Sequence, residues 1–337
     1  MKNIVRWGLL STANINRALI PAIRASARGA LVAVASRDAA KAADYAQKWE
    51  IPQAFGSYEA MLASGEVDAV YISLPNHLHA AWSIRAMNAG IHVLCEKPMT
   101  TSLPDMDAMI AASRQTGRVL AEAFMYRHHP QTKIVGEWVN AGNLGEISLV
   151  RGSFDFAMGS RNNIRLVPEW GGGCLWDVGI YPLSFAQYIM GGPPVAVSGF
   201  QWIGPSGVDE TFAGQMRYSG DRLAQIASAF RTPFYTMVEI VGTEGRLLLN
   251  RPFLDMGDHR RALFFPAGGD PVEIPVPEKM LYLGEVEDMH AAILDGAPQY
   301  LDLSETRAHV QTVLALYESA RADATIFLEA HSFQKGG

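Results

Sequence analysis

Residues 1–125 alternate short apolar runs with stretches of helical periodicity. Gly, Pro or polar residues bound each run, which is typical of strands buried on both faces of a parallel sheet. Between the runs, Ser102 is a favourable N-cap for a helix at 102–115, and a helix at 78–89 ends before Gly90, a favourable left-handed C-cap. This alternation predicts a doubly wound α/β sheet with right-handed crossovers. The predicted strands are Ile4–Leu10, Leu31–Ser36, Ala69–Leu74, His92–Cys95 and Val119–Ala123.

The pattern changes after residue 146. β-rich segments follow one another at hairpin spacing, and Gly220–Asp221 is a favourable turn between two of them. They predict a large, mostly antiparallel open sheet in a C-terminal α+β domain, and helical patterns at 283–294 and 304–322 follow it. The predicted strands are Ile147–Phe156, Val195–Ile203, Glu210–Tyr218, Arg222–Phe230, Met237–Gly242 and Arg246–Leu249.

The length favours two domains, because 337 residues exceed a typical single core. We expect the first domain at residues 1–125 and the second at 126–330. A helix at 130–141 should lead into the second sheet. Residues 331–337 are expected to form a flexible tail.

The composition narrows the class of protein. With 49% hydrophobic and 18% charged residues the chain is ordinary for a globular protein, and its net charge of −6 gives no basis for binding nucleic acid or an anionic membrane. No apolar run is long enough to cross a bilayer, and the first residues have a strand pattern rather than that of a signal peptide. Cys95 and Cys174 are too few for a disulfide framework and fit free, buried thiols, so we expect a cytoplasmic protein.

The first predicted strand leads through a turn of small residues directly into a helix. Such a turn lets backbone N–H groups and the helix N-terminus approach a pyrophosphate. Ser11 and Ala13 stand where the glycine fingerprint has small residues, so the motif alone leaves an ordinary strand-to-helix turn as the alternative. The candidate cofactor-binding residues here are Gly8, Ser11, Thr12, Ala13, Asn14 and Ile15.

The end of the second predicted strand bears on cofactor choice. An NAD site usually offers a carboxylate to the ribose 2′-hydroxyl at this point. Here Ser36 and Arg37 offer a hydroxyl and a guanidinium, which suit a 2′-phosphate, whereas Asp38 is better placed to cap the next helix. The sequence therefore favours NADP over NAD, with an exposed arginine at a helix start as the alternative.

Three further motifs resemble one family. They are Ser73–His79 and Cys95–Met99, each after a predicted strand, and Gly171–Tyr181 in the second half. Together they are similar to the glucose–fructose oxidoreductase / inositol dehydrogenase (Gfo/Idh/MocA) family over nearly the whole chain. The branch with dimeric dihydrodiol dehydrogenase and NADP-dependent xylose dehydrogenases is the most similar, through Arg6–Gly8, Phe124–Gln131 and Asn163–Leu166.

The resemblance implies an NAD(P)-dependent oxidoreductase that acts on a hydroxyl or carbonyl carbon of a sugar, polyol or diol. It implies a nucleotide-binding domain, a substrate-binding domain and a cleft between them. It also implies that the open sheet serves as an interface in a homodimer or homotetramer. Many family members have histidine where this chain has Tyr181, which makes this tyrosine the candidate acid/base.

The chemistry assigns roles to three residues. Lys97 can hydrogen-bond the reacting oxygen and stabilise an alkoxide-like transition state. As a cation it would also lower the pKa of a nearby tyrosine such as Tyr181. Asp177 lies four residues before Tyr181, so the two share a helix face, and Asp177 can orient substrate or simply cap the helix.

Other polar residues are candidates for the same site. Asn76 is expected near the cofactor ribose or nicotinamide, whereas His79 can equally be structural. His128 and His129 lack a third ligand at metal-like spacing, so no metal site is expected. The remaining cofactor candidates are Leu74, Pro75, His79, Glu96, Lys97 and Pro98. The substrate candidates, with an ion pair between domains as the alternative for both arginines, are Arg127, Asn163, Arg165, Asp177 and Tyr181.

Two other functions stay open at this stage. Some relatives hydrolyse glycosides through transient oxidation by a bound nicotinamide. A non-catalytic regulator could keep the fold to sense a dinucleotide, although a sensor has no chemical need for Lys97, Asp177 and Tyr181.

Overall fold

The computed structural model describes residues 3–254 and 260–328. The chain forms two compact units. The first consists of Met1–His129 and Lys279–Thr306, and the second of Pro130–Glu278 and Arg307–Gly337. The expected tail at 331–337 lies outside the described residues. We describe each unit by itself.

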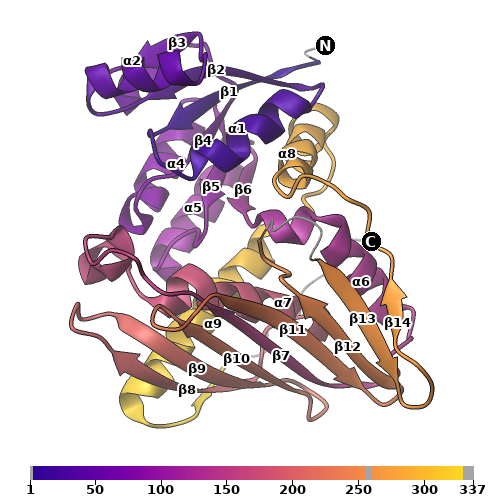
Figure 1. Ribbon diagram of the computed structural model, residues 1–337. Coiled ribbons are helices and arrows are strands. Elements are labelled where there is room, and N and C mark those ends of the chain that lie inside the picture. The colour runs from indigo at the N-terminus through magenta and orange to yellow at the C-terminus, as the bar shows by residue number, and fades with distance from the viewer. Residues whose placement is uncertain (1–2, 255–259, 329–337) are drawn as a thin grey trace. The chain divides into compact units, whose positions relative to one another are not determined.

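The first unit is built on a six-stranded parallel sheet in the order β3-β2-β1-β4-β5-β6 (Figure 1). This is the strand order of dinucleotide-binding folds, and it confirms the predicted doubly wound sheet. The strand β3, which has three residues, was not predicted from the sequence. The strands are β1 Val5–Leu10, β2 Gly29–Ala35, β3 Gln53–Phe55, β4 Ala69–Ile72, β5 His92–Glu96 and β6 Leu120–Ala123.

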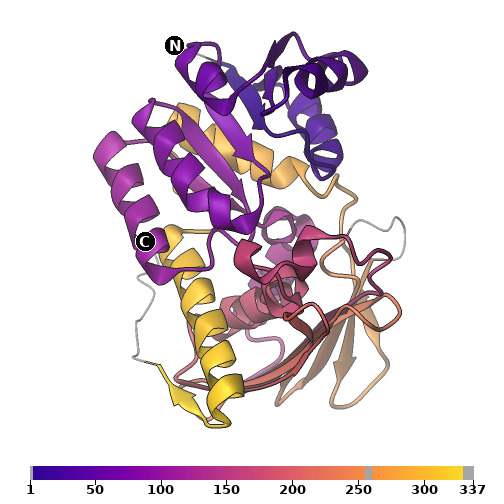
Figure 2. The ribbon, with the colours of Figure 1, turned by 90° about the vertical axis from the view of Figure 1, so that its left-hand side faces the viewer.

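Helices cover both faces of this sheet (Figure 2). As predicted, the Ser102 side chain caps α5 by accepting from the Asp105 N–H, and Asp38 caps α2 by accepting from the N–H groups of Ala40 and Lys41. Gly90, after α4, has the expected left-handed backbone. The helices are α1 Asn16–Ala25, α2 Ala39–Lys48, α3 Tyr58–Ala63, α4 His79–Asn88, α5 Leu103–Thr116 and α8 Leu283–Asp295.

Helix α8 comes from the far end of the chain but packs in the first unit. Its Val286 and Met289 join the apolar cluster that includes Trp7 and Leu94 on one face of the sheet. The Trp7 indole N–H donates to His290 Nε2 over 2.8 Å. Burial of these groups attaches α8 to β1 and β5.

The second unit contains a nine-stranded sheet in the order β14-β13-β12-β11-β7-β10-β9-β8-β15 (Figure 1). Only the central pair β7–β10 is parallel among the described strands, so the predicted mostly antiparallel sheet is confirmed. Gly220 and Asp221 both have positive φ in the β9–β10 turn, as such a hairpin requires. The strands are β7 Ile147–Asp155, β8 Ala196–Ile203, β9 Asp209–Arg217, β10 Leu223–Ala229, β11 Tyr235–Gly242, β12 Gly245–Asn250, β13 Arg261–Pro266, β14 Val272–Ile274 and β15 Ile326–Phe327, of which the last three were not predicted.

One face of this sheet is covered by helices, which are α6 Pro130–Asn140, α7 Ile180–Met190 and α9 Leu303–Ala322. Alternate residues of the strands face α7 and α9 and are buried, such as Phe212 and Met216. Their neighbours on the other face are exposed: Phe200 is 64% accessible, Trp202 41% and Leu223 46%. Within the described ranges, no helix is long and apolar enough to cross a membrane.

Candidate active site

The turn after β1 adopts a glycine-like backbone without glycine. Ser11 has φ +137°. Holding a residue other than glycine in this backbone region costs about 1–3 kcal/mol. Its hydroxyl lies 2.8 Å from Ser73 Oγ and accepts from the Ala13 N–H over 3.1 Å, while the Asn16 side chain donates to the Ser11 carbonyl over 2.8 Å. These bonds stabilise a tight turn whose small residues Ser11–Ala13 remain partly exposed at the start of α1.

Gly8 lies inside β1 rather than in the turn. A Cβ there would lie 2.9 Å from Val67 Cγ1 and 3.0 Å from Met61 Sδ. Close packing of β1 therefore explains this glycine without any ligand. Among the other turn candidates, Asn14 and Ile15 are exposed beside Thr12.

Arg37 follows β2 on the surface, and its neighbours fix the local backbone. The Ser36 hydroxyl accepts from the Asp38 N–H over 3.2 Å, and Asp38 is occupied as the cap of α2. Burial raises the pKa of Tyr58, and the nearby Arg37 guanidinium opposes that shift. Arg37 thus has Tyr58 as a polar neighbour, and the adjacent Asp38 carboxylate is occupied as a helix cap, which fits a 2′-phosphate.

The turns after β4 and β5 are tied together by His79. This buried ring has Nε2 2.7 Å from the Leu74 carbonyl and Nδ1 2.9 Å from the Pro98 carbonyl, and burial lowers its pKa. Both ring nitrogens face backbone, which fits the structural alternative for His79. Pro75 and Asn76 start the short helix after Leu74, at the edge of the sheet where open α/β folds bind ligands.

Lys97 directly follows β5, at the same edge of the sheet, and its peptide bond to Pro98 is cis. The Glu96 carboxylate accepts the Lys97 backbone N–H over 3.2 Å and the Tyr71 hydroxyl. Lys97 is half-buried. Glu96 is thus fixed next to the candidate catalytic lysine rather than free to meet a ligand.

In the second unit, two glycines, Gly172 and Gly173, let the chain pass through a crowded point before α7. A Cβ on Gly172 would lie 2.6 Å from the Arg165 carbonyl, and one on Gly173 would lie 2.1 Å from Asp209 Oδ1. The N–H groups of Gly172 and Gly173 donate to the carbonyls of Val167 and Arg165. The glycines therefore attach the 163–167 loop to the start of the helix.

This arrangement brings three candidate residues together. The Arg165 Nε–H donates to Asp177 Oδ2 over 2.6 Å, and Asn163 caps the short helix that bears Arg165. Asp177 lies in a π-helical turn, Leu175–Gly179, that continues into α7. Tyr181, in the first turn of α7, is buried, with its ring against Phe154 and Phe253 at centroid distances of 5.4 Å.

A buried polar cluster under this helix start was not predicted. Asp209 in β9 accepts from the Leu175 N–H over 2.8 Å, the Cys174 thiol over 3.1 Å and the Tyr317 hydroxyl over 2.7 Å. Asp209, in a strand distant in sequence, therefore caps the helical segment that contains Asp177 and Tyr181. Neither its distance along the chain nor its residue type distinguishes Asp209, so no local signal could have predicted it.

Arg127 is not available to a ligand in this structure. Its side chain is 1% exposed and pairs with both carboxylate oxygens of Glu305, which belongs to the same compact unit. Arg127 thus forms an ion pair, as in the alternative to substrate binding, but both partners belong to one unit and not to two domains. In the described part of the chain, no group of three metal-ligating residues is suited to hold a metal ion, and His128 instead pairs with Asp288 over 2.6 Å.

Comparison with known proteins decides the family. The oxidoreductase family with an NAD-binding Rossmann fold, Gfo/Idh/MocA, matches residues 5–124, and the C-terminal domain of the same family matches residues 132–248. This chain belongs to the Gfo/Idh/MocA oxidoreductase family. The resemblance drawn from the motifs is therefore confirmed, and the chain is an oxidoreductase with a dinucleotide-binding Rossmann fold.

Two similar proteins carry the names of the expected branch, and a third is a solved structure of a ketoreductase. A D-xylose 1-dehydrogenase (NADP⁺) from Haloferax volcanii is 37% identical over 96% of this chain and 99% of its own. A trans-1,2-dihydrobenzene-1,2-diol dehydrogenase from Danio rerio is 33% identical over 72% of this chain and 73% of its own. The structure of a 3-ketoreductase from Actinomadura kijaniata with NADP and TDP-benzene superposes with a TM-score of 0.88 at 28% identity, covering 94% of this chain and 98% of the other.

Proposed function

We propose that this oxidoreductase is an NADP-dependent dehydrogenase or reductase that acts on a hydroxyl or carbonyl carbon of a sugar, polyol or diol. The observation behind it is Lys97, which follows β5 at the ligand-binding edge of a dinucleotide-binding sheet with Glu96 fixed beside it. Relatives named for xylose, dihydrodiol and keto-sugar substrates support the substrate class.

The A. kijaniata ketoreductase supports the choice of catalytic residues. Structures of that protein include one variant with a replaced lysine and one with a replaced tyrosine. Those two residues are separated by the same number of positions as Lys97 and Tyr181 here. The spacing supports the pair as the reacting residues of this chain.

The residues around the turn after β1 fit a dinucleotide. The Ser11–Ala13 turn is small and partly exposed, and it precedes α1 at the point where the strand order reverses. Ser11, Thr12 and Ala13 would bind the pyrophosphate through backbone N–H groups, and Arg37 with Ser36 would bind the 2′-phosphate. When bound, the nicotinamide accepts or donates the hydride.

The side chains of the protein would manage the proton. Lys97 stabilises the negative charge that develops on the substrate oxygen, and Tyr181 takes the hydroxyl proton in oxidation or returns it in reduction. Asp177 and Arg165, paired at 2.6 Å, would orient neighbouring hydroxyls together with Asn163. In this proposal Arg127 stabilises the fold through Glu305 instead of binding substrate.

The test is a substrate panel with both cofactors. Aldoses, inositols, keto-sugars and diols are incubated with NADP(H) or NAD(H), and the absorbance of the reduced nicotinamide is followed. Steady turnover of a free sugar or diol supports the proposal. Release of sugar from a glycoside without net cofactor reduction would instead favour the hydrolase, and tight NADP binding without any turnover would favour the regulator.

The proposal includes assembly and location. Residues 1–125 would bind the cofactor, and 126–330, without the 279–306 segment that packs in the first unit, would bind the substrate. The exposed sheet face of the second unit would pair with another copy of the chain in a dimer or tetramer. A cytoplasmic location fits the two cysteines, which are both free and buried.

A further inference from the structure

Helix α8 places a carboxyl group in the core of the first unit. Glu285 is 1% exposed, and its neighbour Val286 belongs to the apolar cluster formed with Tyr71 and Leu94. Neither oxygen of Glu285 has a hydrogen-bond partner among the residues that the structure describes. A buried carboxylate without donors is costly, so this group requires an explanation.

The carboxyl group of Glu96, which interacts with Glu285, provides this explanation. It lies two residues after Leu94 in β5, so its side chain points to the same face of the sheet as Leu94. Its carboxylate accepts from the Tyr71 hydroxyl and from the Lys97 N–H. Burial and the charges of Glu96 and Glu285 raise the pKa of Tyr71 well above its usual value, so Tyr71 stays a donor.

The donors decide which of the two carboxyls holds a proton. Hydrogen bonds to a carboxylate favour its charged form, and Glu96 receives two of them. Glu285 receives none, and burial, then the charge of Glu96, raises its pKa well above the usual range. A single proton on this pair therefore belongs on Glu285, and Glu96 remains the anion next to Lys97.

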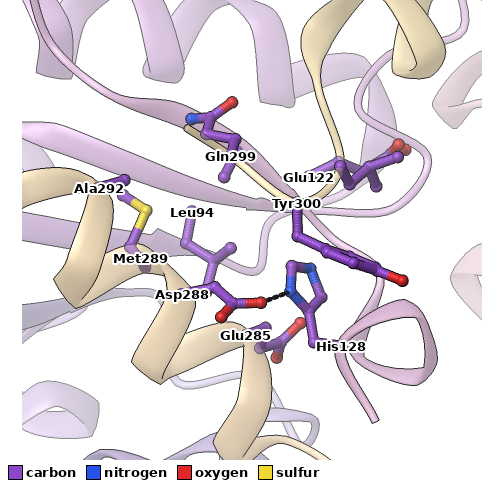
Figure 3. Close-up of a pocket in the computed structure, with 11 residues that line it drawn as sticks. Leu94, Glu122, His128, Glu285, Asp288, Met289, Ala292, Gln299 and Tyr300 are labelled. Atoms are coloured by element: carbon purple, nitrogen blue, oxygen red, sulfur yellow. Dashed lines mark hydrogen bonds and ion pairs between the residues drawn. The ribbon is translucent and has the colours of Figure 1, made fainter. Parts of the chain in front are cut away.

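A small, partly open cavity with room for about one water molecule borders Glu285 (Figure 3). Figure 3 shows Glu285, Asp288 and His128 at one end of it, with the 2.6 Å His128–Asp288 pair beside the Glu285 carboxyl. Several polar side chains line the cavity, so it is suited to hold water. The titratable groups that face Glu285 or the cavity are Tyr71, Glu96, Glu122, His128, Tyr282, Asp288 and Tyr300.

We propose that Glu285 is a positioning residue that holds a proton beside Glu96 and exchanges it with water in this cavity, so that it sets the charge next to Lys97. The link to catalysis rests on the proposed function, because it needs Lys97 as the reacting lysine. As long as Glu285 is neutral, one negative charge lies next to Lys97. When it ionises, a second negative charge stabilises the ammonium form of Lys97.

The protonation state of Glu285 can be measured without any turnover. Infrared spectra of the full-length chain near neutral pH should contain the C=O stretch of a protonated carboxylic acid, and exchange into heavy water should shift it. Glu285→Gln should remove this band. Glu287→Gln is the control, because Glu287 lies on the same helix but is exposed and paired with Lys279, and it should leave the band in place.

The effect on Lys97 is measured through its reactivity. The pH dependence of acetylation of Lys97 by acetic anhydride, followed by peptide mass spectrometry, reports its pKa. Without the second negative charge, Glu285→Gln should move this profile to lower pH by about one unit, whereas Glu287→Gln should not move it.

Two results would overturn the proposal. One is a wild-type spectrum without an acid band that depends on Glu285. The other is an acetylation profile in folded Glu285→Gln that coincides with that of the wild type. Neither measurement uses a substrate, so a failure of the proposed dehydrogenase activity would be seen separately in the substrate panel.

Discussion

Two small residues, one inside β1 and one in the turn after it, perform different tasks. Gly8 lets β1 pack against Val67 and Met61, whereas Ser11 provides the positive φ of the turn and compensates its strain through Ser73 and Asn16. Both are small residues in one motif. Only the contacts show that Gly8 serves packing and that Ser11 serves the geometry of the turn.

Cofactor preference depends on Arg37. We expect Arg37→Ala to weaken NADP binding by about 1.5–3 kcal/mol, the range for a lost hydrogen bond to a charged group, and to leave NAD binding nearly unchanged. The matched control is Lys41→Ala, an exposed cation nearby on α2 that pairs only loosely with Asp38 at 3.8 Å. Calorimetric titration with both cofactors checks this, and tighter binding of NAD than of NADP by the unmodified chain would refute the preference itself.

Lys97→Ala tests the charge at the reacting oxygen. Loss of the ammonium should lower kcat by about 10²-fold or more, as for other groups that stabilise an oxyanion or transfer a proton. Dissociation of NADP should change little, because the binding turn after β1 is intact. Near-normal turnover of this variant would place the chemistry elsewhere.

Tyr181→Phe isolates the hydroxyl from the ring. The ring contacts with Phe154 and Phe253 remain, so the variant should fold normally. If Tyr181 transfers the proton, kcat should fall by about 10²-fold and the alkaline limb of the pH–rate profile should flatten. A variant with normal kcat would mean that Lys97, through a water molecule, transfers the proton instead.

The sequence marks as candidates those site residues that have a local signal, and it does not mark residues that act across the fold. Ser11, Lys97 and Tyr181 follow recognisable strand ends or motifs. Asp209, in contrast, caps the α7 region from a strand that begins 34 residues after Leu175. Such contacts depend on how strands are ordered in the sheet, and no spacing in the sequence encodes that order.

At the scale of elements, strong local signals were sufficient and short edge elements were not. The caps Ser102 and Asp38 were predicted because a cap and its acceptor turn are neighbours in sequence. Three of the missed strands, β3, β14 and β15, have two or three residues each, too few for alternation to be visible, whereas the missed β13 has six. Pairing with a longer neighbour forms these strands.

Helix α8 should detach more easily in acid. His290 Nε2 accepts from Trp7, so the ring must be neutral, and burial lowers its pKa to about 4. A histidine whose pKa is lowered by folding stabilises the fold fully at pH values above its pKa in the unfolded chain, about 6.5. As the pH falls from there towards 4, this contribution is lost by up to about 1.4 kcal/mol per pH unit.

Denaturant unfolding at several pH values measures this loss. His290→Gln keeps an acceptor for Trp7 but does not titrate, so its stability should fall less steeply than that of the wild type over the same range. Parallel curves for the two proteins would show that His290 is not responsible for the pH dependence.

At the scale of the molecule, the chain returns to its first unit near the end. Residues 279–306 pack with the N-terminal sheet, and the Trp7–His290 bond joins residues 283 positions apart. The periodicity at 283–294 predicted a helix there but contained no information on which sheet it covers. Both sheets offer an apolar face, and only tertiary packing selects between them.

The exposed face of the nine-stranded sheet should bind a second copy of the chain. Phe200, Trp202 and Leu223 are large apolar side chains left in water on this face, and such a patch is costly unless it is covered. A specific dimer buries roughly 800 Å² on each partner, which a sheet of this size can provide. We therefore expect a dimer or tetramer by light scattering at micromolar concentration.

Phe200→Glu should dissociate that assembly, because it places a charge in the buried face. Ile4→Glu is the matched control: Ile4 is also exposed, at 49%, but belongs to the first unit, so its substitution should leave the mass unchanged. Since Phe200 faces away from α7 and α9, the variant should keep its fold and its cofactor affinity. A wild-type chain that is strictly monomeric, or an assembly that survives Phe200→Glu but not Ile4→Glu, would show that the interface is not this face of the sheet.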